Sequence, residues 1–261
     1  MISPPLLSID GITFGYNAQQ PVLRGLSGEM HRGKLCAMIG PNAAGKTTLL
    51  KMILGQLQPD QGAVLLQQKP VHKLSFQERA KILSYVPQRA NVNFAFTVRQ
   101  VVAMGRYALP ANSQAVDQAI KETELTSLEE QVYAHLSVGQ QQRVLLARAL
   151  AQAADGGKMM LLDEPGSAMD MRHLHQTMQM LRRLADQGMA ILVVVHDLNL
   201  AAQYADDVWL IHQGTLMASG PWQQVLQPAV LEPIYQIRLQ PTTTGHNTRP
   251  AIHPKFPIDL L

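Results

Sequence analysis

Cysteine and long apolar runs are scarce in this sequence, and it has no run of Lys or Arg. The single cysteine, Cys36, excludes an internal disulfide and is typical of a protein in a reducing cytosol. The longest apolar run, Met189 to Val195, has seven residues, whereas a helix that crosses a bilayer needs about 20, so we expect no membrane-spanning segment. The N-terminus lacks a basic stretch followed by an apolar one, so we expect no secretion. The net charge of +3 is spread along the chain, which argues against a nucleic-acid partner.

The rest of the composition is that of a folded globular protein. Of the 261 residues, 46% are hydrophobic and 16% are charged, which excludes disorder of the whole chain. The length fits one large domain or a domain that carries a subdomain, and no internal repeat is present.

Short apolar segments alternate with helical patterns along much of the chain. The segments have strand length and are apolar at nearly every position, as expected for strands covered on both faces of a parallel sheet: residues 35–39, 159–162 and 190–195. A helical pattern follows each segment, at residues 46–54, 171–184 and 198–204. This alternation predicts a doubly wound α/β core.

Three regions depart from the alternation. Glycines punctuate residues 1–33, which we expect to form β-hairpins, and the four prolines after Gln240 predict an irregular tail on the surface. The third region is an expected helical insert, with periodic stretches at residues 97–104, 113–124 and 138–152. The resulting division is a single domain over 1–240, with its core at 1–88 and 154–240 and the insert at 89–153, and a Pro-rich tail over 241–261.

One loop carries a specific phosphate-binding pattern, G-x-x-x-x-G-K-[ST], after a predicted strand and before a predicted helix. Backbone N–H groups of such a loop and the helix N-terminus form an anion cradle. Lys46 can reach the β- and γ-phosphates of a nucleotide, and the Thr47 hydroxyl can bind Mg²⁺. The alternative is a glycine-containing loop without a ligand. The predicted phosphate-binding residues are Gly40, Pro41, Asn42, Ala43, Ala44, Gly45, Lys46, Thr47 and Thr48.

Two further predicted strands end in ionisable side chains. Asp163 and Glu164 follow one of them; Asp163 suits magnesium, and Glu164 suits proton transfer from an attacking water. His196 ends the other strand and could donate to the γ-phosphate or to that water. Taken alone, the acids could be a solvated turn and the histidine a structural residue. Because ligands of parallel sheets bind at the carboxyl ends of strands, we expect these ends to meet at one crevice.

Residues 136–143, Leu-Ser-Val-Gly-Gln-Gln-Gln-Arg, resemble the L-S-G-G-Q signature of ATP-binding cassette (ABC) ATPases, and the resemblance extends over residues 6–235. It implies an α/β P-loop fold, with a RecA-like parallel-sheet core, an N-terminal antiparallel β subdomain and an inserted α-helical subdomain. Tyr16 is similar to the aromatic residue that stacks on adenine, residues 167–170 to the loop that touches a partner subunit, and His196 to the switch histidine. The implied catalytic residues are Lys46, Gln88, Glu164 and His196, the implied metal ligands are Thr47, Gln88 and Asp163, and the implied signature contacts to ATP are Ser137, Gly139 and Gln140.

The resemblance also implies cofactors and partners. ATP and Mg²⁺ are the expected ligands of a head-to-tail homodimer, in which the signature of one copy faces the γ-phosphate held by the other. Without a membrane-spanning segment of its own, the chain is expected to be the ATPase of an importer. Such a subunit binds two separate permease subunits, works indirectly with a periplasmic binding protein, and lies peripherally on the cytoplasmic face of the inner membrane.

Three segments favour one branch of the family, since they are similar to cassettes for iron-siderophore, heme and vitamin B12 uptake: residues 101–106, 196–202 and 211–220. The last of them is most similar to heme importers, so we predict ATP hydrolysis that powers heme uptake. The alternatives are siderophore or vitamin B12 import, a soluble cassette protein outside transport, and a small-molecule kinase with the same phosphate loop.

Four positions depart from the family pattern: Ala43, Val138, Gly166 and Met169. We expect Val138, a β-branched residue where the signature has glycine, to slow hydrolysis or to loosen the closed dimer. The apolar side chains expected to receive a helix of each membrane subunit are Phe94, Phe96, Met104 and Tyr107, although they could simply pack the insert. His173 and His175 would face apart on a helix and make a poor metal or heme pair.

Overall fold

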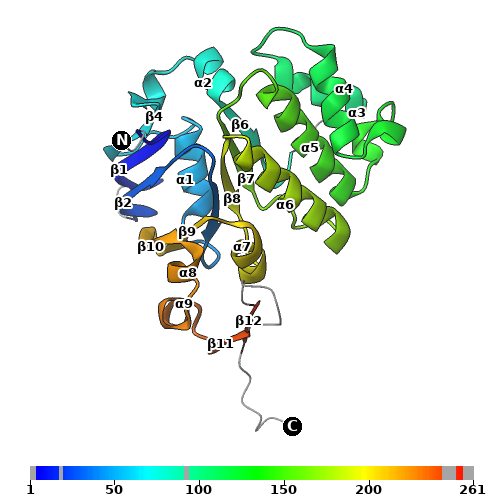
Figure 1. The fold of residues 1–261 in the computed structure, drawn as a ribbon. Coiled ribbons are helices and arrows are strands. Elements are labelled where there is room, and N and C mark those ends of the chain that lie inside the picture. Colours follow the sequence, from blue (N-terminus) through cyan, green and yellow to red (C-terminus); the bar gives the residue numbers. More distant parts are fainter. Residues whose placement is uncertain (1–3, 18–19, 91–93, 243–250, 255–261) are drawn as a thin grey trace.

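A six-stranded sheet forms the centre of the protein in this computed structural model, which describes residues 4–17, 20–90, 94–242 and 251–254 (Figure 1). The strand order is β10-β9-β3-β8-β7-β6, and all neighbours are parallel except β10 and β9. The bounds are Leu35–Ile39 (β3), Leu83–Val86 (β6), Met159–Asp163 (β7), Ala190–Val194 (β8), Asp207–His212 (β9) and Thr215–Pro221 (β10). Every residue of β3, β7 and β8 is buried, which confirms the three predicted strands.

A second, antiparallel sheet contains the N-terminal residues, as predicted. Its order is β2-β1-β4-β5, with bounds Leu7–Phe14 (β1), Leu23–Met30 (β2), Gln61–Leu66 (β4) and Lys69–Pro70 (β5). Helix α1 (Lys46–Ile53) lies between the two sheets, and its apolar side chains share one core cluster with those of β1, β3 and β8 (Figure 1). The phosphate loop that precedes α1 is therefore anchored by both sheets.

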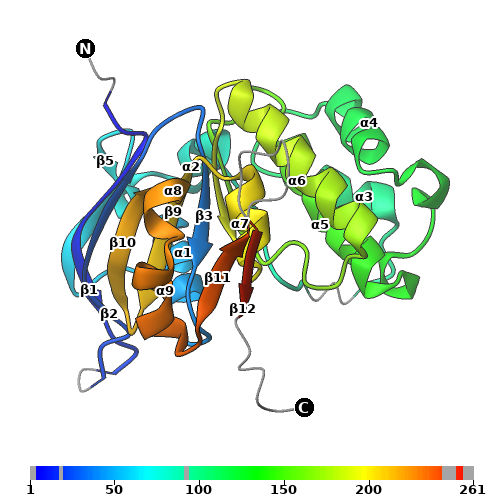
Figure 2. The same ribbon diagram turned by 60° about the horizontal axis from the view of Figure 1, so that its bottom comes forward.

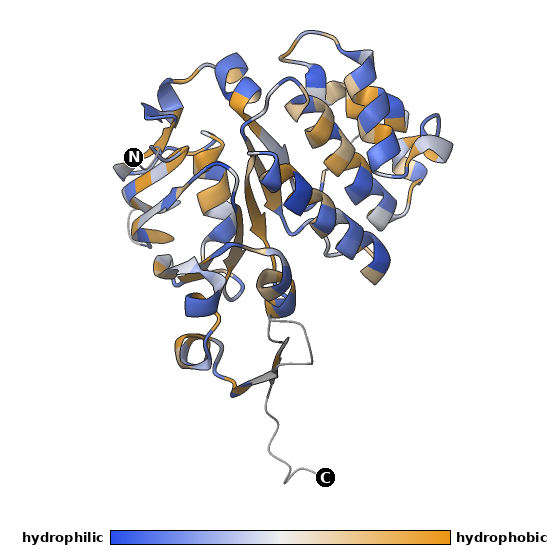
Figure 3. Cartoon of the chain, in the orientation of Figure 1, coloured by the Kyte–Doolittle hydropathy of each residue, from blue (hydrophilic) through white to orange (hydrophobic). Residues whose placement is uncertain are grey.

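The helical insert packs beside the sheet (Figure 2), on the side of β6 and β7 (Figure 1). It contains α3 (Val98–Ala103), α4 (Ser113–Glu122) and α5 (Val138–Ala153), which match the predicted periodic stretches. The remaining helices are α2 (Phe76–Ile82), α6 (Met171–Asp186), α7 (Leu198–Tyr204), α8 (Trp222–Val225) and α9 (Pro228–Tyr235). Figure 3 shows the apolar strands enclosed by helices with hydrophilic outer faces. In the described part of the chain, no helix is long and apolar enough to cross a membrane.

The tail differs from its prediction. Residues Leu239–Thr242 (β11) and Ala251–Pro254 (β12) pair as an antiparallel hairpin next to α7 (Figure 2), so the expectation of an irregular tail is wrong for these residues. Ile252 is 5% exposed and belongs to the main core, so this part of the tail is not merely surface. Pro250 and Pro257 lie outside the described residues.

Candidate functional site

The phosphate loop joins β3 to α1 and contains two glycines whose positive φ angles a residue with a side chain rarely adopts. Gly40 and Gly45 have φ of 145° and 104°, and a Cβ at Gly45 would lie 2.8 Å from Leu23 Cδ2. A side chain caps the first turn of each of α2 to α7, whereas no side chain caps α1. The first N–H groups of α1 therefore remain available to an anion.

Lys46 is buried at the first position of α1. Its Nζ donates to the carbonyl oxygens of Gly40, at 2.7 Å, and of Pro41, at 2.9 Å. Burial lowers the pKa of the Lys46 ammonium, and the carboxylates of Glu164 and Asp163 oppose that change. The ammonium thus lies inside the loop, close to where a phosphate would bind.

Asp163 ends β7 and is 3% exposed. The Thr47 hydroxyl donates to Asp163 Oδ2 at 3.1 Å, so two predicted metal ligands meet, one from the first turn of α1 and one from the end of β7. Burial raises the pKa of the Asp163 carboxyl; the hydrogen bond from Thr47 opposes this shift. The result is a cluster of oxygen ligands of the kind that Mg²⁺ prefers.

The raised pKa of Asp163 predicts a pH-dependent stability. The folded chain holds the Asp163 proton more tightly than the unfolded chain does. The protonated carboxyl therefore stabilises the fold below the ordinary carboxyl pKa of about 4, and this stabilisation is lost as the pH rises through the raised pKa. Without metal and nucleotide, we expect Asp163→Asn to be about 1 kcal/mol more stable than the parent near neutral pH, because a buried charge is removed. Urea unfolding in a chelator at a series of pH values measures this difference.

Asp155 serves as the control of opposite sign. The hydrogen bond from Arg106 lowers the pKa of the Asp155 carboxyl. The ionised carboxylate therefore stabilises the fold above the ordinary carboxyl pKa, and this stabilisation is lost as the pH falls through the lowered pKa. Asp155→Asn should therefore be less stable than the parent near neutral pH. A pH-independent difference for Asp163→Asn would contradict the expectation.

Glu164 lies between two of the predicted catalytic side chains. Gln88 Nε2 donates to Glu164 Oε2 at 2.7 Å, and His196 Nε2 lies 2.5 Å from Glu164 Oε1. Glu164 has a left-handed φ of 51°, which a residue with a side chain rarely adopts. This conformation turns the carboxylate at the end of β7 toward both partners.

Four neighbouring strands thus deliver the site residues. In sheet order, β3 is followed by Lys46 and Thr47, β8 by His196, β7 ends in Asp163 and is followed by Glu164, and β6 is followed by Gln88. Three strand ends were predicted to meet, and β6 adds a fourth. Tyr16 is 61% exposed, stacks edge-on against Phe14 and lies 3.5 Å from Thr48 through their hydroxyl oxygens.

The signature residues begin α5. Ser137 caps this helix in a reciprocal capping box with Gln140, and a Cβ at Gly139 would lie 2.7 Å from the Ala168 carbonyl oxygen. Val138 is 53% exposed there. Within the described part of the chain, no residue of the phosphate loop lines the hollow of about 450 Å³ beside Ser137 and Gly139. One chain therefore presents the phosphate loop and the signature on separate surfaces.

Sequence reasoning missed Gln142, which connects three loops of the site. It is 3% exposed, and its amide nitrogen donates to the Gln88 carbonyl oxygen at 3.3 Å and to Ser167 Oγ at 3.1 Å. Its amide oxygen accepts from the Ala168 N–H at 3.4 Å. The available signal was its position: Gln142 precedes the buried Leu145 and Leu146 by three and four residues, so it lies on the buried face of α5.

Two of the departures from the family pattern have a local explanation. A Cβ at Gly166 would overlap the Leu174 side chain, so the space that a threonine needs is filled. Ala43 has a left-handed φ of 60° and an exposed side chain. The alanine methyl therefore strains the loop without packing against the core.

Replacing Ala43 by glycine should relieve this strain. We expect Ala43→Gly to stabilise the nucleotide-free protein by about 1 kcal/mol, since the left-handed conformation costs an L-residue about that amount. Thermal unfolding checks this expectation. Ala63→Gly, at an ordinary strand position, is the control and should destabilise; a lower melting temperature for Ala43→Gly would refute the strain.

A hollow of about 330 Å³ lies between α2, α5 and the segment after α3. Met104 and Tyr107, two of the four residues predicted to receive a helix of a membrane subunit, line it, whereas Phe94 and Phe96 do not and instead contact each other at 5.7 Å between ring centroids. Phe76 also lines this hollow and was missed. His173 and His175 have separate partners, Asp170 and Tyr204, as expected for side chains that face apart.

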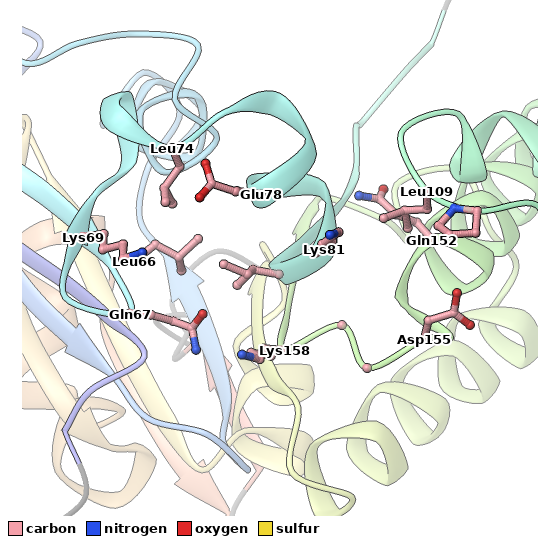
Figure 4. A pocket seen from close by; sticks show the side chains of 14 residues that line it. Leu66, Gln67, Lys69, Leu74, Glu78, Lys81, Leu109, Gln152, Asp155 and Lys158 are labelled. Atoms are coloured by element: carbon pink, nitrogen blue, oxygen red, sulfur yellow. The ribbon is translucent and has the colours of Figure 1, made fainter.

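A cavity of about 540 Å³ lies at the opposite edge of the sheet (Figure 4). Ile82 and Lys158, which precede β6 and β7, line it together with Leu66, Leu74 and Leu109. It contains none of the predicted site residues.

Comparisons with known proteins agree with this geometry. The sequence pattern of the family described as ABC transporter matches residues 23–167. The hemin import ATP-binding protein HmuV of Pseudomonas putida is 39% identical over 238 residues, which cover 89% of this chain and 93% of that protein. HmuV of Rhodopseudomonas palustris is 40% identical over 214 residues, which cover 79% of each chain.

A solved structure supports the same assignment. It is described as an inward-facing conformation of a metal-chelate type ABC transporter, with a TM-score of 0.82 and 26% identity, and the match covers 97% of this chain and 98% of that one. Fold, motif order and relatives agree. The chain therefore belongs to the ABC transporter family and is an ATP-binding ATPase of that family.

Proposed function

We propose that this chain is the ATP-hydrolysing subunit of an importer that carries heme across the bacterial inner membrane. The observation that supports heme most strongly is the similarity to hemin import ATP-binding proteins over 89% of the chain. The metal-chelate type of the similar solved structure agrees with the wider uptake group. The second candidate function is import of an iron siderophore or of vitamin B12.

In the proposed reaction, water attacks the γ-phosphate of ATP held by the phosphate loop. Lys46 gives its ammonium to the β- and γ-phosphates in exchange for the Gly40 and Pro41 carbonyls that it contacts without nucleotide. Glu164 takes the proton from the attacking water, and His196 donates a hydrogen bond to the γ-phosphate. Tyr16 stacks on the adenine through its exposed ring.

Mg²⁺ fits the oxygen ligands at the ends of β3 and β7. Thr47, Asp163 and Gln88 would hold it, Asp163 through water, and the bound ion would neutralise phosphate charge. Asp163 must be ionised in that role, so its raised pKa makes metal binding release a proton when the group is still protonated.

Without nucleotide, each oxygen of the Glu164 carboxylate has one polar neighbour, Gln88 at Oε2 and His196 at Oε1, and keeps a second lone pair. A general base needs a free lone pair within hydrogen-bond reach of the water. We infer that ATP draws His196 toward its γ-phosphate and Gln88 toward the metal, which weakens their hold on the Glu164 carboxylate and lets it turn toward the attacking water. Gln142 would pass this change to α5, because it bonds to the Gln88 carbonyl.

The separate surfaces of phosphate loop and signature support a head-to-tail homodimer. Each ATP would lie between the loop of one copy and Ser137, Gly139 and Gln140 of the other, with the N-terminus of α5 directed at the γ-phosphate. Hydrolysis would remove the shared phosphate contacts and open the dimer. The expected effect of Val138 on the rate or on dimer closure stays a prediction.

The hollow beside α2 supports binding of two membrane-spanning permease subunits at the cytoplasmic face of the inner membrane, with the periplasmic binding protein acting through them. Its rim carries Phe76, 62% exposed, and Tyr107, 89% exposed. Large exposed aromatic side chains around a hollow are typical of a protein interface.

We expect Tyr107→Ala to weaken assembly with the membrane subunits at least about tenfold, the effect of losing an aromatic interface anchor. ATP hydrolysis by the isolated chain should be unchanged, since none of the described site residues lines the hollow that Tyr107 borders. Co-purification from detergent measures the assembly. Met217→Ala, which removes an exposed side chain on β10, is the control, and equal recovery of both variants would contradict docking at this hollow.

Heme accumulation in proteoliposomes tests the proposed function. The chain is reconstituted with its membrane subunits, and vesicles receive ATP on the side of the chain and binding protein loaded with heme, siderophore or vitamin B12 on the other. ATP-dependent transport of heme alone is expected. Transport of another cargo keeps the mechanism and discards heme, and failure to assemble with any membrane subunit discards import.

A further inference from the structure

The helix that follows His196 is tied to the end of the chain. Asp197 caps α7, and its Oδ1 accepts from the Asn199 N–H at 2.7 Å. The Asn199 side chain makes two hydrogen bonds to the backbone of one residue of β12. Its Oδ1 accepts from the Ile252 N–H at 2.7 Å, and its Nδ2 donates to the Ile252 carbonyl oxygen at 3.3 Å. Figures 1 and 2 both show β12 next to α7.

The register of the hairpin explains why Ile252 is free to make these bonds. Residues opposite each other in an antiparallel pair alternate between exchanging two hydrogen bonds and exchanging none. Ile252 lies opposite Pro241, and proline has no N–H to give. The N–H and C=O of Ile252 therefore point away from β11, where the Asn199 carboxamide satisfies both.

The hairpin is also fixed to the body of the protein. Leu239 and Ile252 are 7% and 5% exposed and belong to the main core, and the Leu239 N–H donates to Glu232 Oε1 of α9 at 2.7 Å. Through Asn199, this anchored hairpin restrains the first turn of α7. The Asn199 backbone lies three residues after His196.

His196 lies between the end of β8 and the first turn of α7. Its side chain is 46% exposed and lies against Glu164, and on the strand side the Val195 N–H bonds to the Met38 carbonyl oxygen at 3.2 Å. On the helix side, the restraint comes from the Asp197 cap and from the contact between Asn199 and Ile252. Movement of the first turn of α7 would therefore move the imidazole relative to Glu164.

We propose that the C-terminal hairpin positions His196 for ATP hydrolysis, and that Asn199 is the positioning residue that links them. The inference rests on the proposed role of His196. In this role Asn199 needs no contact with the nucleotide or the reacting atoms, since it acts through the backbone between residues 196 and 199. The hairpin thus belongs to the catalytic apparatus of the chain.

Three variants of the full chain break the link in different ways. Asn199→Ala removes both hydrogen bonds, Ile252→Pro removes the N–H that donates to Asn199 together with a buried isoleucine side chain, and a chain that ends at Gln240 removes β12. A chain that ends at Pro254 keeps the hairpin and is the control. We expect kcat for ATP hydrolysis to fall about tenfold in the three variants, with KM for ATP within about twofold of the parent, as for a misplaced catalytic group. If the shortened chain does not fold, the two point variants decide the question.

A double-mutant cycle with His196→Ala separates positioning from general destabilisation. If Asn199 acts through His196, then Asn199→Ala should lower kcat no further in the His196→Ala background. An additional tenfold fall in that background would overturn the inference, as would an unchanged kcat for Asn199→Ala alone. An unchanged kcat for His196→Ala would remove the proposed role of His196 and the inference with it.

Discussion

Glu164→Gln should abolish nearly all ATP hydrolysis, with kcat falling about 1000-fold, while ATP binding is retained. The reason is that glutamine cannot accept the proton of the attacking water, and a positioned general base contributes about 100-fold to 10000-fold. Glutamine has the shape of glutamate and can keep a contact with Gln88 and His196, so the left-handed backbone at this position is not further strained. The variant also lacks a negative charge near the γ-phosphate, which favours the ATP-loaded state.

Two measurements check this result. Phosphate release in the steady state gives kcat, and size-exclusion chromatography with ATP and Mg²⁺ reveals a dimer that forms and does not open. Glu29→Gln, on the exposed face of β2, is the matched control and should leave both unchanged. A Glu164→Gln chain that hydrolyses ATP at a tenth of the parent rate or faster would exclude Glu164 as the base.

Lys46→Ala should weaken ATP binding about 100-fold, because charge-assisted hydrogen bonds to phosphate contribute about 2–3 kcal/mol. Hydrolysis should be undetectable at ATP concentrations that saturate the parent. The loop itself also loses two hydrogen bonds, to the Gly40 and Pro41 carbonyls, so the nucleotide-free variant is expected to be less stable.

Equilibrium binding of a fluorescent ATP analogue measures the affinity, and thermal unfolding without nucleotide measures the stability. Lys51→Ala removes the same kind of side chain from the last turn of the same helix and should bind ATP like the parent. Equal affinities of Lys46→Ala and the parent would contradict the assigned phosphate site.

The strands that carry the site could be predicted because their chemistry is local. Residues of β3, β7 and β8 are buried on both faces and are therefore apolar at nearly every position, and polar site residues follow directly after them. The phosphate loop could also be predicted, because the spacing of its glycines is a pattern within one segment. The order of the strands in the sheet, which makes Gln88 a neighbour of Glu164, is not encoded in any single segment.

The roles of Gln142 and of the tail follow only from tertiary structure. In the sequence, Gln142 is one of three consecutive glutamines. Only the packing of α5 in the folded chain buries it against the Gln88 carbonyl, Ser167 and Ala168. In the tail, proline appeared to exclude regular structure, yet Pro241 occupies a position of the hairpin where its missing N–H is not required. Such a position becomes visible only when the partner strand is known.

The head-to-tail arrangement of two copies is the central claim about how the site works, and a mixing experiment tests it most directly. One copy carries Lys46→Ala and the other Ser137→Arg, and ATP hydrolysis is measured for each protein alone and after mixing. If each site joins the loop of one copy to the signature of the other, both proteins are inactive alone. A mixed dimer then retains one intact site, so the mixture recovers up to about a quarter of the parent rate when the copies pair at random. A mixture as inactive as its components would contradict a site shared between two copies.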